Sequence, residues 1–283
     1  ISYAGNGERG VNCLREIISQ GRDEIVNVII PSGNPTTAQG LEEIAKKQNI
    51  PILSPERINR KENVRELATY KPDMMILAGY NQILRRQVIE IPLGGCINLH
   101  GGKLPDYRGA SVINWAMING ESRIGLSIIY VDTGIDTGDI IAETSFQLNY
   151  EDTIKEVQEK VVELFPPLLL ETLDQIRDGT VQRKVQNLKE GKYWHKRRQE
   201  DGKIDWNKSS GEIYNFVRAL TRPYPGAFTY HKNEKIMVWN SRPYEDTYEG
   251  PTGKVISESP LIVSTGQGLI ELKDITFFGS LSL

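Results

Sequence analysis

The sequence has little cysteine and no long apolar run. Its two cysteines, Cys13 and Cys96, are too few for the disulfide framework of a small secreted domain or for a four-ligand zinc site. Both lie in apolar stretches, which indicates buried thiols in a reducing compartment. No apolar run approaches the roughly 20 residues that cross a bilayer, and no basic and apolar leader precedes the first predicted strand. These absences predict a cytoplasmic protein without disulfides or a membrane span.

An excess of positive charge is also missing. The chain has 34 basic and 37 acidic side chains, a formal net charge of -3. No overall positive field would attract nucleic acid through its phosphates, so bulk nucleic-acid binding is disfavoured. Hydrophobic residues make up 39% and charged residues 25%, values typical of a folded globular protein. At 283 residues the chain has room for two domains.

Short apolar runs alternate with helical periodicity over residues 1–180. We expect strands at Ile1–Ala4, Ile25–Pro31, Ile52–Leu53, Met74–Ala78, Cys96–Leu99, Gly125–Val131 and Ile140–Leu148. A glycine-containing turn is expected at Gly5–Gly10, and helices are expected at Val11–Gln20, Ala38–Gln48, Asn63–Tyr70, Leu84–Glu90, Ser111–Asn119 with a serine cap, and Thr153–Asp178. This alternation is typical of an α/β fold, here a Rossmann-like, mostly parallel sheet with flanking helices.

The composition changes after Gly179. Residues 181–210 are polar and include three consecutive cations at 196–198, which predicts a linker or crossing segment. Residues 211–283 begin with helical spacing over Gly211–Leu220. Short apolar runs follow at Ile236–Trp239, Gly253–Ser257, Leu261–Ser264 and Gly268–Leu272. We therefore expect a catalytic domain over 1–180 and a smaller, β-rich, OB-like C-terminal domain over 211–283.

Two polar residues interrupt a predicted buried strand in the first half. Asn98 and His100 are two positions apart, so on a strand their side chains lie on the same face. They stand at its carboxyl end, where open α/β sheets bind ligands. A histidine can accept a proton from an attacking amine, and an asparagine amide can donate to the oxyanion of a tetrahedral intermediate. With a nearby carboxylate to orient the imidazole, this set predicts acyl transfer to an amine without a covalent nucleophile.

The carboxylate cannot be chosen from the pattern alone. The segment Val131–Asp139 contains Asp132, Asp136 and Asp139 among glycines and threonines, as an ordinary turn would. It lacks the terminal glutamate of a calcium loop, so we expect no metal.

The motifs together resemble the folate-dependent formyltransferases. The matching signature is Asn-x-His at 98–100, a Leu-Pro and Tyr-Arg-Gly loop at 104–109, and Gly-Ile-Asp-Thr-Gly at 134–138. Further similarity lies at 114–115, 119–121, 218–220 and 223–228. The resemblance implies that Asn98, His100 and Asp136 form the catalytic centre. It also implies a donor site for 10-formyltetrahydrofolate, carried over by position to Gln82, Ile83, Leu84, Asp132, Thr133, Gly134 and Ile135.

The acceptor divides the members of this family. Gly-Gly-Lys-Leu-Pro at 101–105 looks most like the formyltransferases of nucleotide-linked amino deoxysugars, enzymes of O-antigen and polysaccharide biosynthesis. Ala110 replaces an arginine of the UDP-aminoarabinose enzyme, which argues against that substrate. A sugar nucleotide needs cations for its pyrophosphate and aromatic surfaces for its rings. The candidate contacts are Arg9, Lys103, Arg108, Trp115 and Tyr224.

Two alternatives stay open at this point. Residues 189–198 interleave basic and aromatic side chains, which would suit the aminoacyl end of a tRNA in a methionyl-tRNA formyltransferase. A non-catalytic protein that binds folate or a nucleotide sugar is the second alternative, although the intact Asn, His and Asp set argues against it. We expect no membrane partner, consider nucleic acid an unfavoured partner, and leave open a homodimer.

Overall fold

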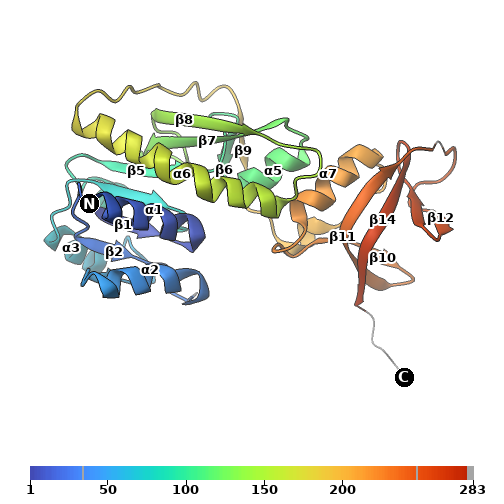
Figure 1. Cartoon of the computed structure of the whole chain (residues 1–283), viewed down its shortest axis with the longest axis horizontal. Coiled ribbons are helices and arrows are strands. Elements are labelled where there is room, and N and C mark those ends of the chain that lie inside the picture. The colour runs from blue at the N-terminus through green and yellow to red at the C-terminus, as the bar shows by residue number, and fades with distance from the viewer. Residues whose placement is uncertain (34, 247, 279–283) are drawn as a thin grey trace. The chain divides into compact units, whose positions relative to one another are not determined.

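The computed structural model describes residues 1–33, 35–246 and 248–278 (Figure 1). The chain divides into two compact units. Unit 1 contains residues 1–109, 125–146 and 159–193, and unit 2 contains residues 110–124, 147–158 and 194–283. The expected boundaries at residues 180 and 210 stay predictions.

Unit 1 is built on a seven-stranded sheet with the order β3-β2-β1-β4-β5-β7-β8. Its strands are β1 (Ser2–Gly5), β2 (Asn27–Ile29), β3 (Ile52–Leu53), β4 (Met75–Ala78), β5 (Cys96–His100), β7 (Arg123–Tyr130) and β8 (Ile140–Gln147). The pairs from β3 through β5 are parallel, and β7 runs antiparallel to β5. The Rossmann-like, mostly parallel α/β prediction is therefore confirmed.

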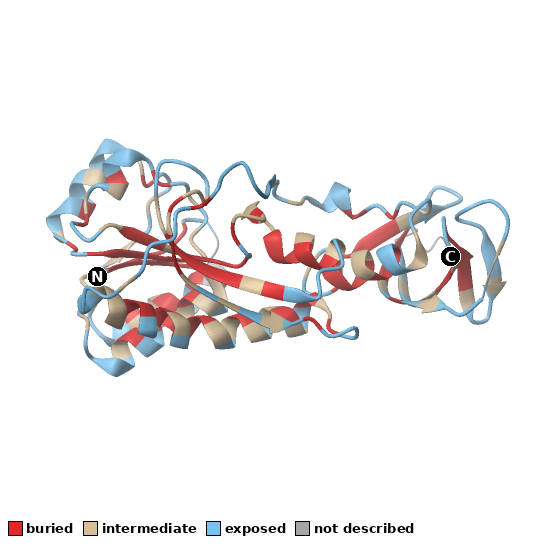
Figure 2. Cartoon of the chain, turned by 90° about the horizontal axis from the view of Figure 1, so that it is seen from above, coloured by how far each residue is buried: buried red, intermediate tan, exposed pale blue. Residues whose placement is uncertain are grey.

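The central strands of this sheet are apolar, as expected for strands buried on both faces. Every residue of β1 and of β4 is buried, and Figure 2 shows the central strands of this unit mostly buried. The helices of the first half are α1 (Gly7–Gln20), α2 (Pro35–Lys47), α3 (Lys61–Thr69), α4 (Arg86–Ile89), α5 (Val112–Ile118) and α6 (Ile154–Arg177). Cys13 and Cys96 are free and buried, and burial raises the pKa of each thiol to about 12. The prediction of two buried thiols is confirmed.

One predicted helix start was wrong, and one predicted cap hydrogen bond is absent. The glycine-containing segment expected as a turn at Gly5–Gly10 enters α1 already at Gly7, four residues before the expected start at Val11. Ser111 does not cap α5: it has a left-handed φ of 55°, and its side chain makes no cap hydrogen bond. Its hydroxyl instead accepts a hydrogen bond from the backbone N–H of Arg197 at 3.2 Å. An N-cap residue usually has an extended backbone, and the left-handed Ser111 does not satisfy the first turn of α5.

Unit 2 contains a five-stranded sheet with the order β10-β11-β14-β13-β12. The strands are β10 (Ala227–His231), β11 (Glu234–Tyr244), β12 (Val255–Glu258), β13 (Leu261–Ser264) and β14 (Leu269–Phe278), all paired antiparallel. Helix α7 (Ser210–Leu220) begins at a capping box in which Ser209 and Glu212 exchange hydrogen bonds. Its buried face packs on this sheet in one core that includes Val217, Val238 and Ile270. The predicted β-rich C-terminal domain is confirmed.

Three short elements fall outside these two sheets. Strands β6 (Tyr107–Gly109) and β9 (Lys192–Trp194) pair with each other, and a 3-10 turn spans Gln199–Gly202. Across the described residues, no helix has the length and apolar character needed to span a membrane.

Candidate active site

Strand β5 positions two of the three predicted catalytic side chains. Asn98 pairs with Leu77 of β4 and with Ile129 of β7, and His100 pairs with Ser127 of β7. Asn98 therefore stands between two neighbouring strands, and His100 follows it at the carboxyl end of β5. His100 is only 5% exposed, so its imidazole is largely removed from water.

Asp136 lies in the loop between β7 and β8, which we call the aspartate loop (residues 131–139). The Asp132 carboxylate shapes this loop by accepting hydrogen bonds from the Gly134 N–H at 2.9 Å and the Thr137 hydroxyl at 2.6 Å. Asp136 itself has a φ of 53°, a left-handed conformation that non-glycine residues seldom adopt. Such a conformation persists only where the surrounding structure holds it.

The three predicted catalytic side chains converge around the Asp136 carboxylate. Its Oδ1 accepts from Asn98 Nδ2 at 3.4 Å, and its Oδ2 lies 3.5 Å from His100 Nδ1. Oδ2 also accepts a shorter hydrogen bond, 2.8 Å, from the backbone N–H of Gly109. Because a carboxylate can only accept, the nitrogen of the Asn98 amide must face it, and one N–H of that amide stays available to another acceptor.

The imidazole of His100 is fixed from its other side. Nε2 lies 2.6 Å from the backbone carbonyl of Tyr107, and a carbonyl only accepts, so Nε2 carries a proton. In the neutral ring the lone pair is then on Nδ1, beside Asp136. Gly102 allows this contact, because a Cβ there would lie 2.9 Å from Nε2 and 2.8 Å from the Tyr107 oxygen. The geometry thus provides a proton acceptor at Nδ1 with a carboxylate beside it.

Gln186 belongs to this site, although its polar surroundings predicted a linker. Its Nε2 donates to the backbone carbonyls of Asp136 at 2.9 Å and Gly138 at 2.7 Å. The residue is 7% exposed. The sequence gives no signal for this role. Gln186 stands among other polar residues, and nothing in that stretch distinguishes a buried glutamine from an exposed one.

The predicted donor-site residues occupy two loops of unit 1. Gln82 bonds the segment before α3: its Oε1 accepts from the Ile58 N–H at 2.8 Å, and its Nε2 donates to the Pro55 carbonyl at 2.9 Å. Ile83 is 63% exposed, whereas Leu84 is buried in the core with Met75 and Val88. In the aspartate loop, the residues Asp132, Thr133, Gly134 and Ile135 are all exposed. The donor-binding roles of both loops stay predictions.

Three of the predicted substrate contacts lie in unit 1. The guanidinium of Arg9 lies 5.3 Å from the centre of the Phe165 ring. Lys103 forms an ion pair with Asp106 at 2.9 Å and is well exposed. Arg108 donates weakly to the backbone carbonyls of residues 188 and 190, at 3.5 and 3.4 Å. Their roles in substrate binding stay predictions.

The two aromatic candidates lie in unit 2. The Trp115 indole donates to the His195 carbonyl at 3.0 Å, its ring lies 4.9 Å from that of Trp194, and the Arg197 guanidinium covers it at 4.5 Å. Tyr224 accepts from the Gln158 amide at 3.2 Å. These side chains are thus already engaged within unit 2, and their roles in substrate binding stay predictions.

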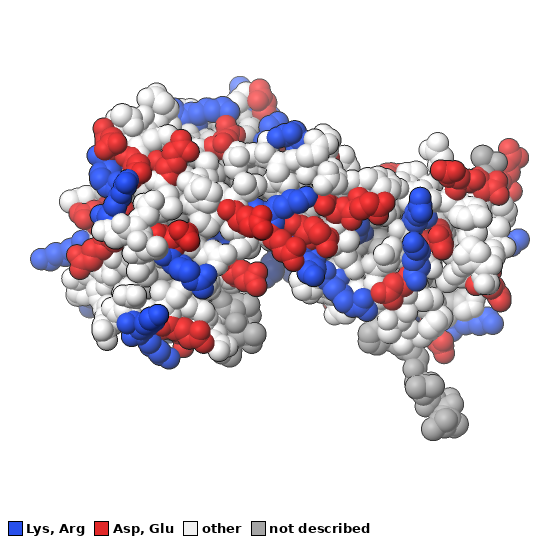
Figure 3. Space-filling view, in the orientation of Figure 1, with Lys and Arg blue, Asp and Glu red and all other residues white. Residues whose placement is uncertain are grey.

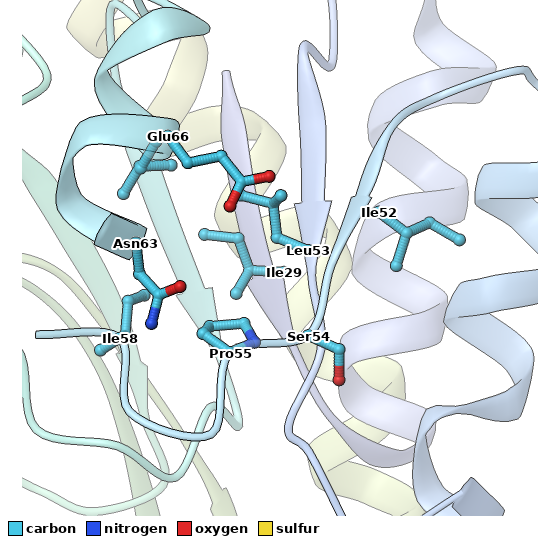
Figure 4. Close-up of a pocket in the computed structure, with 9 residues that line it drawn as sticks. Ile29, Ile52, Leu53, Ser54, Pro55, Ile58, Asn63 and Glu66 are labelled. Carbon is cyan, nitrogen blue, oxygen red and sulfur yellow. The ribbon is translucent and has the colours of Figure 1, made fainter. Parts of the chain in front are cut away.

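A separate cleft of about 170 Å³ opens beside β2, β3 and α3 (Figure 4). Its floor is apolar, with Ile29, Leu53 and Ile58, and Asn63 and Glu66 stand at its rim. None of Asn98, His100 and Asp136 lines it. Among the described residues there is also no cluster of three or more histidine, cysteine or acidic side chains that could hold a metal.

Comparison with known proteins matches both parts of the chain. The formyl transferase family model matches residues 4–173, and the model of the formyl transferase C-terminal domain matches residues 196–280. A methionyl-tRNA formyltransferase of Alkaliphilus oremlandii is 33% identical over 287 residues, covering 99% of this chain and 92% of that protein.

Two solved structures share the fold. WlaRD, described as a sugar 3N-formyl transferase with dTDP and 5-N-formyl-THF, has a TM-score of 0.75 at 20% identity and covers 96% of each chain. An N-formyltransferase from Helicobacter canadensis, in complex with folinic acid and dTDP-3-aminofucose, has a TM-score of 0.71 at 19% identity. That match covers 96% of this chain and 98% of the other.

Proposed function

Because the chain belongs to the formyl transferase family, and is therefore an enzyme of formyl transfer, we propose that it moves the formyl group of 10-formyltetrahydrofolate to the amino group of a nucleotide-linked amino deoxysugar. The observation that carries this proposal is the convergence of Asn98 and His100 on the carboxylate of Asp136, at the carboxyl end of the sheet. We assign the catalytic roles to these three residues.

The two loops of unit 1 fit a folate donor. Ile83 and Ile135 offer exposed apolar side chains, 63% and 39% exposed, of the kind that cover an aromatic ring. Thr133 and Gly134 are exposed in the aspartate loop and would meet the polar edge of a pterin with backbone groups other than the Gly134 N–H, which already donates to Asp132. The two similar structures were obtained with 5-N-formyl-THF and with folinic acid, which supports a folate ligand. When bound, the donor supplies an electrophilic formyl carbon.

The chain's own residues would prepare the acceptor amine. His100 Nδ1 holds the lone pair that can take the proton that the acceptor nitrogen loses as the neutral amine attacks the formyl carbon, since Nε2 is committed to the Tyr107 carbonyl. Asp136 stabilises the imidazolium that results. The second N–H of Asn98 is free to donate to an oxygen that gains negative charge, an effect typically worth about 2.7–4 kcal/mol.

The sugar-nucleotide acceptor is supported by the loop after β5 and by the ligands of the similar structures. The loop carries Gly101-Gly102-Lys103-Leu104-Pro105, with Lys103 and Arg108 as cations for a pyrophosphate. Both similar structures were obtained with a dTDP compound. On the face shown in Figure 3, basic and acidic side chains are interspersed, which offers no broad positive surface for RNA.

A second candidate acceptor is methionyl-tRNA. It is favoured by the 33% identity to a methionyl-tRNA formyltransferase along almost the whole chain. The basic and aromatic segment 189–198 would be its contact, although Trp194 and Arg197 already pack on Trp115.

One assay separates these candidates. The purified full chain is given 10-formyltetrahydrofolate with dTDP-, GDP- and UDP-linked amino sugars or with methionyl-tRNA, and tetrahydrofolate release and product mass are measured. We expect turnover with a sugar nucleotide and its loss in His100→Asn. Activity on methionyl-tRNA alone would overturn the sugar acceptor, and no turnover with any acceptor would favour a binding protein. Unchanged turnover in His100→Asn would exclude the role given to that residue.

A further inference from the structure

A stretch without regular secondary structure, residues 183–190, makes hydrogen bonds to the aspartate loop and to the strand that follows it. We call residues 183–190 the strap. Lys184 and Ile140 exchange two backbone hydrogen bonds of 2.9 Å, which adds the strap to the start of β8. The Lys184 ammonium pairs with Glu143 at 3.1 Å, and the Arg183 guanidinium covers the Tyr130 ring at 3.9 Å. The strap therefore holds both strands that flank the aspartate loop.

Gln186 is the inward-facing residue of the strap. Residues 182–185 and 187–190 are exposed, whereas Gln186 is buried. An amide nitrogen has two hydrogens, and Nε2 of Gln186 has two acceptors, the carbonyls of Asp136 and Gly138. Its Oε1 is buried without a hydrogen-bond partner among the described residues, so the contact to the loop rests on the nitrogen alone.

The two hydrogen bonds from Gln186 restrict the backbone at Asp136 and so the direction of its side chain. The carbonyl oxygens define the planes of the peptides that follow Asp136 and Gly138. Holding those planes holds the left-handed φ of 53° at Asp136, because rotation toward an ordinary conformation would break the contact at 2.9 Å. The carboxylate would then turn away from Asn98 Nδ2 and His100 Nδ1, with which it makes long contacts of 3.4 and 3.5 Å.

We propose that Gln186 is a positioning residue for the Asp136 carboxylate, acting through the backbone of the aspartate loop. The proposal rests on the proposed function for its kinetic consequence, but the contact itself can be tested without turnover. Gln186 has no direct role in proton transfer in this scheme. It sets the distance between a carboxylate and an imidazole.

The test compares three variants of the full chain. Gln186→Met keeps the length of the side chain and removes both donors, and Gln186→Glu keeps its shape and replaces the donor by an acceptor. Gln182→Met is the matched control, since Gln182 lies four residues before Gln186, is exposed, and donates to the Thr180 carbonyl at 3.1 Å, outside the aspartate loop. Steady-state kinetics, thermal unfolding and amide hydrogen exchange of residues 131–139 are measured for each.

We expect both Gln186 variants to lower kcat by about 10–100-fold with KM nearly unchanged, because a displacement of about 1 Å at a catalytic group can cost that much. Hydrogen exchange in the aspartate loop should rise at least about tenfold in both, while Gln182→Met matches the wild type. Unchanged kcat and exchange in a folded Gln186→Met protein would overturn the proposal. So would unfolding of both Gln186 variants, which would indicate a purely structural role. If the wild type turns over no acceptor, the proposed function fails, and hydrogen exchange alone decides on Gln186.

Discussion

Replacing Asp136 by asparagine tests the centre of the site with almost no change in shape. Oδ2 of the carboxylate contacts the Gly109 N–H at 2.8 Å and His100 Nδ1 at 3.5 Å. Oδ1 contacts Asn98 Nδ2 at 3.4 Å. The amide of an Asp136→Asn side chain can still accept from Gly109. Its nitrogen then faces the nitrogen of Asn98, and relief of that donor–donor contact requires the Asn98 amide to reverse.

The magnitude follows from the distance between carboxylate and imidazole. Two unit charges 3.5 Å apart attract by about 5 kcal/mol at an effective dielectric constant of about 20. Asp136 is 13% exposed, so solvent screens part of this attraction. If about 3–4 kcal/mol is lost from the imidazolium-like transition state, kcat should fall by about 10²–10³-fold.

Initial rates of tetrahydrofolate release at saturating substrates measure this effect. Asp139→Asn is the matched control, because it removes a carboxylate from the same loop without altering the one that faces His100, and it should retain wild-type kcat within about threefold. Hydrogen exchange of residues 131–139 checks that Asp136→Asn keeps the loop folded. A folded Asp136→Asn enzyme with kcat within about threefold of wild type would refute the electrostatic role of the carboxylate.

Three further predictions concern the neighbouring loops and the second unit. Leu84→Ala should lower the free energy of unfolding in urea by about 2–5 kcal/mol, because it leaves a cavity in the core. Ile83→Ala should change that free energy by less than about 0.5 kcal/mol and raise the donor KM. Equal destabilisation by the two variants would contradict the different burial of the two side chains. In Gly134→Ala the new methyl group would overlap the Thr137 hydroxyl, so steady-state kinetics should show a donor KM about tenfold higher, and an unchanged KM would rule out the donor role of this turn. Hydrogen bonds from the N-cap backbone and hydroxyl lower the pKa of Glu212 to about 2, so its contribution to stability is complete above about pH 4.5 and lost as pH falls toward 2. Glu212→Gln should flatten that part of the stability curve, and an unaltered curve would argue against the capping box.

Much of the fold followed from local pattern. The continuous apolar runs at Met74–Ala78 and Cys96–Leu99 predicted two central strands within one residue of β4 and β5. The Asn-x-His spacing placed two side chains on one face of a buried strand, and the structure has them there. Both predictions rest on patterns within a few adjacent residues, a continuous apolar run and a spacing of two on a strand, so a short segment of sequence is enough to recognise them.

Other features depend on partners far along the chain. Ser111 stands where a helix cap is expected, yet its hydroxyl is used by Arg197, 86 residues later. Gln186 looks like any polar residue of a linker until it is placed against Asp136, 50 residues earlier. The strands β6 and β9 have three residues each, too few for a period to be recognised. The choice of Asp136 over Asp132 and Asp139 needed the family resemblance for the same reason.

The position of the strap after α6 matters for how this chain can be divided or recombined. A truncated chain ending with the last long helix would contain Asn98, His100 and Asp136, and would seem to be a complete catalytic half. It would nonetheless lack Gln186 and the backbone pairing of Lys184 with Ile140. A chimaera that exchanges the C-terminal segment should therefore join its parts after residue 193, so that residues 183–190 stay with the aspartate loop, and the new segment must also fit residues 110–124 and 147–158 of unit 2.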